Sequence, residues 1–150
     1  MPGTISRCSR LIFDFGGLLM DTERPDEAEG LGLRLAVAGG SARSWPGPAT
    51  SPRFEVLACG DEVAGHKPDP AVYRLALDRL SLPPEAATAF EDTPRGVSAA
   101  VAAGLRCVAI PHAYAQSSRF AHAYLVLTTA ASVLPAEVLT RIVATAAVPR

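Results

Sequence analysis

A buried apolar run ends on a carboxylate next to glycines. In LIFDFGGLLMDTE (residues 11–23), the apolar residues stop at Asp14, and Gly16 and Gly17 follow closely. A carboxylate at the end of a strand can act as a nucleophile or as a metal ligand. Glycines beside it allow the backbone to turn tightly and to approach a ligand. Asp14 is therefore the first candidate for chemistry.

Two further stretches could hold an anion near such a carboxylate. The run LAVAGGS ends in Gly39, Gly40 and Ser41, whose backbone N–H groups could face an anion. The segment GDEVAGHKPDP carries Lys67, which is the single lysine of the chain beside thirteen arginines. A compact ammonium group could bind a phosphoryl oxygen there.

The segment FEDTPRG places two acidic residues, Glu91 and Asp92, at the end of another apolar run. Carboxylates that crowd together with Asp14 would repel one another unless a hard cation lay among them, and Mg²⁺ prefers such oxygen ligands. Lys67 would offset part of the negative charge. Each feature alone could be only a turn or a helix start, but their combination predicts a magnesium and phosphate site.

The elements that must position these residues read as an α/β domain. Strand-like runs alternate with helical patterns, which predicts a mostly parallel sheet whose sites form beyond the carboxyl ends of the strands. We expect strands at 10–15, 33–38, 54–58, 87–91 and 106–110, with an edge strand at 124–127. Helices are expected at 69–80, at 94–103 and roughly at 135–146.

The first of these helices carries a start signal and an apolar face. Asp69 suits the N-cap and Pro70 the first helical position. Apolar residues recur at helical spacing, which predicts a buried face made of Val72, Leu75, Ala76 and Leu80.

Composition excludes several classes of function. The chain has 150 residues and a net charge of -1, without a basic block, so we expect one domain over 1–150 and no nucleic-acid surface. The apolar run that stops at Asp14 is too short for a signal sequence or a membrane span. Cys8, Cys59 and Cys107 lie far apart and form no CxxC motif. They predict free thiols in a reducing compartment, and hence a cytoplasmic protein.

Together, LIFDFGGLLMDTE, LAVAGGS, GHKPDP and AFEDTPRGVSAAVAAG resemble the four signature motifs of the haloacid dehalogenase superfamily of hydrolases. The last two are similar to those of its phosphoglycolate phosphatase and β-phosphoglucomutase branch. The resemblance extends from Leu11 to about Pro111. It implies a Rossmann-like core and a two-step reaction, in which an aspartate takes the phosphoryl group and water then hydrolyses the aspartyl-phosphate.

The resemblance also implies roles for single residues. Asp14 matches the nucleophile and a Mg²⁺ ligand, and the backbone carbonyl of Gly16 and the carboxylate of Asp92 match the other protein ligands. Glu91 matches the acidic neighbour outside the ligand set. Lys67 matches the lysine that neutralises charge around the nucleophile and the phosphate, while Gly39, Gly40 and Ser41 match the second phosphate-binding motif.

The sequence departs from the family pattern at three places. Phosphatases of the family usually carry a second Asp where this chain has Gly16, and general acid–base catalysis is typically worth about 10²–10⁴-fold. The usual Ser or Thr of the second motif falls at Gly39, which should weaken phosphate binding by roughly 1–3 kcal/mol unless Ser41 substitutes. Only about ten residues, 24–33, stand where this branch inserts a cap domain.

Without a cap, we expect an open pocket that accepts a small or a larger phosphorylated substrate. A homodimer could cover the apolar residues 17–20 beside it. Three functions stay open at this point. The first is a Mg²⁺-dependent phosphatase, the second a binding or regulatory module that has lost turnover, and the third, least favoured, a haloacid dehalogenase.

Overall fold

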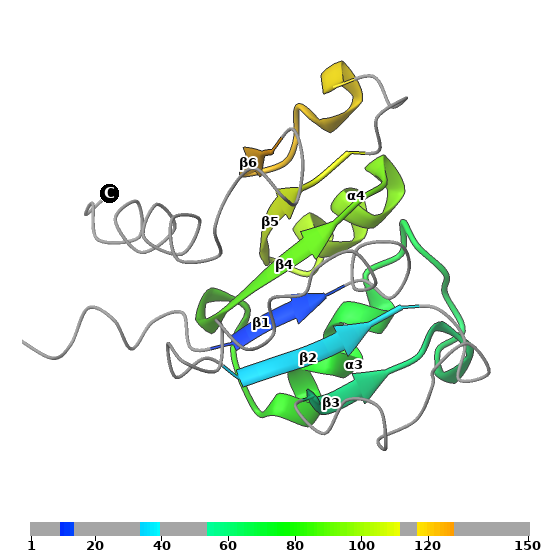
Figure 1. The fold of residues 1–150 in the computed structure, drawn as a ribbon. Coiled ribbons are helices and arrows are strands. Elements are labelled where there is room, and N and C mark those ends of the chain that lie inside the picture. Colours follow the sequence, from blue (N-terminus) through cyan, green and yellow to red (C-terminus); the bar gives the residue numbers. More distant parts are fainter. Residues whose placement is uncertain (1–9, 14–33, 40–53, 112–116, 128–150) are drawn as a thin grey trace, which may run out of the picture.

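The computed structural model describes residues 10–13, 34–39, 54–111 and 117–127. These residues form one sheet, with strands at Arg10–Phe13 (β1), Arg34–Ala38 (β2), Phe54–Ala58 (β3), Ala87–Glu91 (β4), Arg106–Ala109 (β5) and Leu125–Val126 (β6). The strand order is β3-β2-β1-β4-β5-β6 (Figure 1). All five pairings are parallel, so the predicted α/β class and the predicted parallel sheet are confirmed.

The predicted strands and the observed ones differ by a few residues at their ends. The strands expected at 54–58 and 87–91 have the expected bounds. β5 ends at Ala109, although the N–H of Ile110 still donates to the carbonyl oxygen of Glu91 at 2.7 Å. The edge strand has only two residues, Leu125 and Val126, although the N–H groups of Tyr124 and Leu127 also donate to carbonyl oxygens of β5.

β1 lies inside the sheet, between β2 and β4. Its last residue, Phe13, is in register with Val37 of β2 and with Phe90 of β4. Ala38 and Glu91 are therefore the residues that extend one position beyond the end of β1 on its two neighbours. Because every pairing is parallel, the carboxyl ends of the strands share one edge of the sheet.

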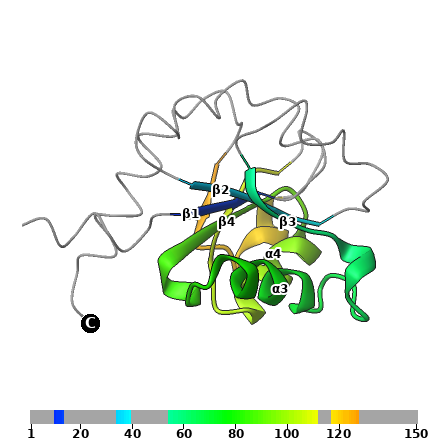
Figure 2. The same cartoon turned by 90° about the horizontal axis from the view of Figure 1, so that it is seen from below.

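Two α-helices, α3 (Ala71–Leu80) and α4 (Pro94–Ala102), lie on the same face of the sheet (Figure 2). Short 3₁₀ helices lie at Gly60–Glu62 (η3), Pro84–Ala86 (η4) and Ser117–Phe120 (η5). No helix in these described stretches is long and apolar enough to cross a membrane.

The first helix starts two residues later than predicted. Pro70, and not Asp69, is the N-cap of α3, and Ala71 is its first residue. Asp69 still serves the helix start, because its Oδ1 accepts a hydrogen bond from the N–H of Ala71 at 2.9 Å. α4 begins at Pro94 as predicted and ends at Ala102 rather than at residue 103.

The buried face of α3 is also rotated from the prediction. Val72, Ala76 and Leu80 are buried as expected, but Leu75 is only partly buried. Tyr73 and Leu77 are buried instead. The side chains of the sheet that pack against these helices are small, which allows α3 and α4 to lie close to the sheet. These small buried residues include Ala36, Ala38, Ala58, Ala89, Cys107 and Ala109.

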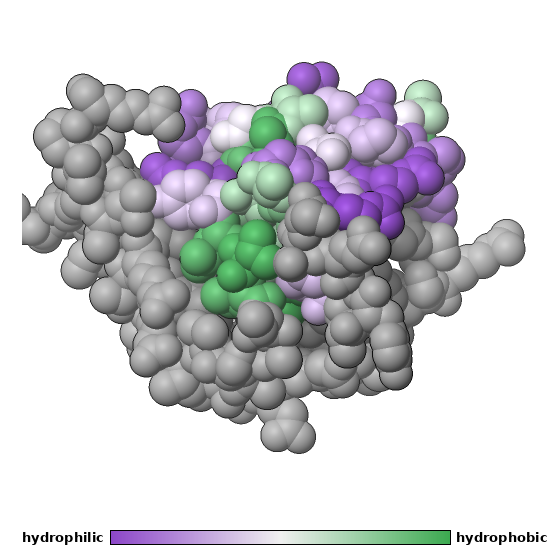
Figure 3. Space-filling view, turned by 90° about the horizontal axis from the view of Figure 1, so that it is seen from above, coloured by the Kyte–Doolittle hydropathy of each residue, from purple (hydrophilic) through white to green (hydrophobic). Residues whose placement is uncertain are grey.

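Hydrophobic surface also remains exposed on the side of the molecule where β6 lies. Figure 3 shows apolar side chains gathered in the middle of this view and hydrophilic ones over much of the remaining described surface. Three large hydrophobic residues are exposed in the described part of the chain, namely Val101, Tyr124 and Val126. Cys59 and Cys107 are both buried.

Several predictions fall on residues outside the described part of the chain. These are the shortened cap segment at 24–33, the exposed apolar residues 17–20, the helix at 135–146 and the thiol of Cys8. They stay predictions, as does the assignment of the whole chain to one domain.

Candidate functional site

The ammonium group of Lys67 lies across the carboxyl end of β1. Lys67 belongs to the loop between β3 and α3, and its Nζ donates to the carbonyl oxygen of Ala38 at 3.2 Å. The same Nζ donates to Oε1 of Glu91 at 2.5 Å. Ala38 ends β2 and Glu91 ends β4, the two neighbours of β1. The single lysine of the chain is thus placed where the strand that precedes Asp14 ends.

Glu91 is the buried anion of this site. Its side chain is fully buried, and its Oε1 also accepts a hydrogen bond from the hydroxyl of Tyr73. Burial raises the pKa of Glu91, while the charge and hydrogen bond of Lys67, and then the hydrogen bond of Tyr73, act in the opposite direction. The ring centroid of Tyr73 is 5.0 Å from Nζ of Lys67, so the same side chain contacts both members of the ion pair.

Gly96 makes room for the other oxygen of this carboxylate. Among the described residues, Oε2 of Glu91 has no hydrogen-bond partner. A Cβ atom at Gly96, in the first turn of α4, would overlap with the Glu91 carboxylate. The N–H of Gly96 itself donates to Oγ1 of Thr93, the N-cap of α4, at 3.0 Å. The positive end of the helix dipole therefore faces a carboxylate, which is favourable.

Asp92 follows β4 directly and is 7% exposed. Two of the three metal ligands that the sequence predicts, Asp14 and the carbonyl of Gly16, lie outside the described residues. Within the described stretches, no group of three or more His, Cys, Asp or Glu side chains could hold a metal ion. A nearly buried carboxylate at the strand-end edge, beside the ion pair of Lys67, fits the role of one oxygen ligand to Mg²⁺.

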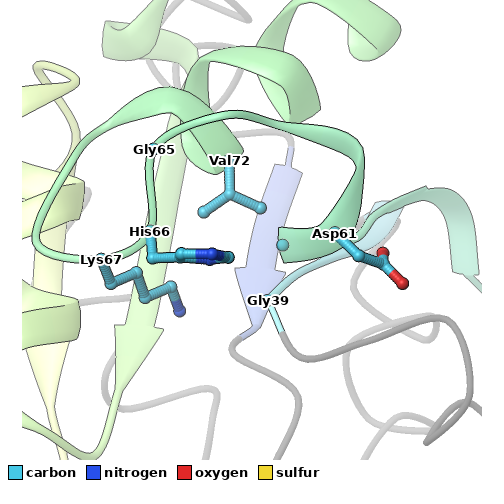
Figure 4. Close-up of a pocket in the computed structure, with 7 residues that line it drawn as sticks. Gly39, Asp61, Gly65, His66, Lys67 and Val72 are labelled. Atoms are coloured by element: carbon cyan, nitrogen blue, oxygen red, sulfur yellow. The ribbon is translucent and has the colours of Figure 1, made fainter.

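A cavity of about 410 Å³ opens beside Lys67. Figure 4 shows His66 and Lys67 on one side of it and Asp61 on the other. Its lining residues are Gly39, Gly60, Asp61, Gly65, His66, Lys67 and Val72. The N–H of Gly39 donates to the carbonyl oxygen of Ala58 at 2.9 Å, so this amide is engaged in pairing β2 with β3. Gly40 and Ser41, the other predicted phosphate-binding residues, lie outside the described part of the chain.

Arg79 and Glu62 hold the base of the loop that carries Lys67. Nη1 and Nη2 of Arg79 donate to the two carboxylate oxygens of Glu62 at 2.9 and 2.7 Å. Glu62 also accepts from the N–H of Cys59 at 2.7 Å, and Arg79 donates to the carbonyl oxygen of Leu57 at 2.5 Å. These contacts connect the end of β3 to the last turn of α3. Hydrogen bonding to Arg79 and to the Cys59 N–H lowers the pKa of Glu62 to about 2.

Arg95 fixes the same loop at Lys67 itself. Its Nη2, in the first turn of α4, donates to the carbonyl oxygen of Lys67 at 2.6 Å. Sequence reasoning missed Tyr73, Glu62, Arg79 and Arg95 as residues around the site. Tyr73 could have been found from the sequence, because it lies beside predicted core positions of α3 and a buried tyrosine hydroxyl needs a hydrogen-bond partner. The other three gave none, because the Arg79–Glu62 pair and the Arg95–Lys67 contact join residues that are 17 and 28 positions apart in the chain.

A parallel α/β sheet with acidic and basic side chains meeting at its carboxyl edge is typical of a Rossmann-like core. Residues 50–110 match the family model described as haloacid dehalogenase-like hydrolase. This part of the chain thus matches the haloacid dehalogenase superfamily, as the resemblance of its motifs predicted.

Known proteins with similar sequences and structures support this assignment. Protein CbbY of Cereibacter sphaeroides is 44% identical over 105 residues, which cover 65% of this chain and 46% of that protein. A phosphorylated carbohydrates phosphatase of Thermotoga maritima is 48% identical over 52 residues, covering 35% of this chain and 24% of the relative. The chain therefore spans less than half the length of these curated relatives.

The crystal structure of CbbY from Rhodobacter sphaeroides in complex with xylulose-1,5-bisphosphate has the same fold. It superimposes with a TM-score of 0.61 at 42% sequence identity, and the match covers 70% of this chain and 50% of that one. The Rossmann-like core that the sequence predicts is thus confirmed.

Proposed function

We propose that this chain carries the core of a Mg²⁺-dependent phosphatase that cleaves phosphate monoesters through an aspartyl-phosphate on Asp14. The position of Lys67 carries the proposal. Its ammonium bridges the ends of β2 and β4, and the strand between them, β1, is the one that leads into Asp14. A fixed positive charge at that place would offset the charge of a phosphoryl group as it is transferred.

The proposed reaction has two steps. A carboxylate oxygen of Asp14 forms a bond to phosphorus while the ester P–O bond breaks, and the leaving oxygen takes up a proton. Water then attacks the phosphorus of the aspartyl-phosphate, which releases inorganic phosphate and restores the carboxylate. Gly16 has no side chain to move these protons, so we expect turnover to be slow.

The chain offers three oxygen ligands for Mg²⁺, namely the carboxylates of Asp14 and Asp92 and the backbone carbonyl of Gly16. When bound, the ion would neutralise part of the charge of the phosphoryl group. Asp92 supports this assignment because it is nearly buried at the edge of the sheet where Lys67 also lies. Glu91 is engaged with Lys67 and Tyr73, which supports its place outside the ligand set.

We propose a phosphorylated sugar as the substrate class. The relatives carry the support, since one is named for phosphorylated carbohydrates and the other was crystallised with xylulose-1,5-bisphosphate. The cavity of about 410 Å³ beside Lys67 has room for such a molecule. If residues 24–33 are all that stands in place of a cap, larger phosphorylated substrates would also reach the site.

Hydrolysis of p-nitrophenyl phosphate in the presence of Mg²⁺ tests the proposal. We expect Asp14→Asn to abolish the activity and EDTA to suppress it, whereas Asp78→Asn, an exposed change on α3, should leave it intact. Equal rates in the wild type and Asp14→Asn would refute the enzyme and favour a binding or regulatory module. Chloride release from a haloacid, abolished by the same substitution, would instead favour a dehalogenase.

Two further points belong to the same proposal. A homodimer that covers the site would appear as twice the monomer mass in light scattering. We also propose a cytoplasmic location, because the sequence predicts thiols rather than disulfides, and Cys59 and Cys107 are both buried.

A further inference from the structure

Tyr73 contacts both members of the ion pair at the proposed active site. Its hydroxyl donates to Oε1 of Glu91, the same oxygen that accepts from Nζ of Lys67. Its ring lies 5.0 Å from that Nζ. Tyr73 is fully buried in α3, whereas the side chain of Lys67 keeps 18% exposure and reaches the cavity. The buried phenol thus lies behind the charged group that faces the cavity.

We propose that Tyr73 is a positioning residue, which locks the Glu91 carboxylate in the orientation that presents the Lys67 ammonium to the substrate phosphate. The inference rests on the proposed function. In this proposal Tyr73 does not contact the substrate itself, but it fixes the position of the Lys67 ammonium, which does.

The two oxygens of Glu91 have unequal surroundings, and this inequality is the basis of the proposal. Oε1 accepts from both Lys67 and Tyr73, while Oε2 has no hydrogen-bond partner among the described residues and lies against Gly96. The terminal torsion of a glutamate is broad and has no sharp minimum of its own. A second donor on Oε1 therefore decides which oxygen faces Lys67 and how far the carboxylate can rotate.

Positioning of this kind matters because lysine is a flexible point charge. Its four-carbon side chain leaves the ammonium mobile unless other groups fix it. Arg95 holds the backbone of Lys67, and Ala38 and Glu91 hold its Nζ. Among these three groups, Glu91 is the charged one, and its carboxylate also accepts a hydrogen bond from the buried Tyr73 hydroxyl. Small errors in the placement of catalytic groups can cost about 10²-fold in rate.

The single lysine of the chain allows a test that needs no catalytic activity. In protein labelled with ¹³C,¹⁵N-lysine, the Cε–Hε signals report on Lys67 alone. We expect two distinct Hε signals with a high order parameter in the wild type. In Tyr73→Phe, which keeps the ring and removes only the hydroxyl, they should merge and the order parameter should fall. Tyr124→Phe, at an exposed tyrosine, should change neither.

Kinetics then separate positioning from simple stabilisation. We expect Tyr73→Phe to lower kcat about tenfold, with a smaller change in KM, because charge placement matters most in the transition state. Thermal unfolding identifies the temperature range in which the variant is fully folded, and the assays are run there. If folded Tyr73→Phe has the same Lys67 signals as the wild type, or the same kcat, the proposal is overturned.

A second variant and a phosphate titration keep this test separate from that of the proposed function. Glu91→Gln retains an acceptor for Tyr73 but removes the charge that holds Lys67, so the Lys67 signals of this variant should also merge. Unchanged signals would contradict the role of Glu91 in positioning Lys67. Inorganic phosphate with Mg²⁺ should shift the wild-type Lys67 signals. If it does not, the phosphatase proposal fails, and with it the role of Tyr73 toward substrate, even where the Tyr73→Phe signals change as expected.

Discussion

Nζ of Lys67 and Oε1 of Glu91 lie 2.5 Å apart, although the two residues are 24 positions apart in the chain. The pair joins the loop after β3 to the end of β4, and the strands β2 and β1 lie between β3 and β4 in the sheet. Glu91 is fully buried, and the side chain of Lys67 is 18% exposed. The contact is therefore a link between two halves of the fold as well as a part of the proposed active site.

Removal of the lysine should destabilise the protein. In Lys67→Met, the buried Glu91 carboxylate loses its cation and keeps Tyr73 as a donor. We expect the free energy of unfolding to fall by about 2–4 kcal/mol, since one charge of a buried pair is left behind. Urea denaturation measures the loss, and Arg74→Met, at an exposed position of α3, serves as the control. A loss below about 0.5 kcal/mol, as at ordinary surface positions, would contradict the role of the pair.

Gly96 should be required for the close packing of Glu91 on α4. A Cβ atom there would overlap with the Glu91 carboxylate, which is pinned by two hydrogen bonds and cannot move away freely. We expect Gly96→Ala to cost about 1–3 kcal/mol of stability, as overpacking does, despite the higher helix propensity of alanine. Val101→Ala, at an exposed position of the same helix, provides the comparison. A Gly96→Ala protein as stable as the wild type in urea would show that the carboxylate can rearrange.

Thr93 should stabilise the start of α4 through its hydroxyl. Its Oγ1 accepts from the N–H of Gly96 at 3.0 Å. We expect Thr93→Ala to lower the free energy of unfolding by about 1 kcal/mol, because that N–H loses its partner. Thr93→Ser keeps the hydroxyl and should retain most of the stability. Equal losses in the two variants would show that the methyl group, and not the cap, matters.

Glu62 should titrate far below ordinary glutamates. Hydrogen bonds from Arg79 and from the Cys59 N–H lower its pKa from 4.5 to about 2. Because the folded pKa lies below the ordinary value, the contact stabilises the fold above pH 4.5 and this contribution is lost as the pH falls toward 2. Both side chains are more than a third exposed, so we expect an effect below about 1 kcal/mol.

Carboxyl ¹³C chemical shifts across an acid titration check this expectation. Arg79→Gln should raise the pKa of Glu62 toward its ordinary value, because the main cause of the shift is removed. Arg74→Gln, on the same helix, should leave that pKa unchanged. A Glu62 pKa near 4.5 in the wild type would mean that the contact does not persist in solution.

The local elements of this protein are determined by its sequence. Apolar runs bounded by Gly, Pro and charged residues marked the strands at 54–58 and 87–91 with their observed bounds. Alternation of strands and helices sufficed to predict the parallel sheet, and thus that Lys67 and Glu91 would lie at one edge. These features depend on backbone preferences and hydrophobic periodicity, which act over a few residues.

The contacts within the site depend on the tertiary structure. Strand order places β1 between β2 and β4, so that one ammonium can reach both Ala38 and Glu91. The rotation of α3 on the sheet buries Tyr73 in place of Leu75 and brings its hydroxyl to Glu91. Such pairs join elements far apart in the chain, and their geometry follows from how helices pack on a sheet. Local periodicity carries no information about that packing, so the sequence could name the charged residues but not the phenol that orients them.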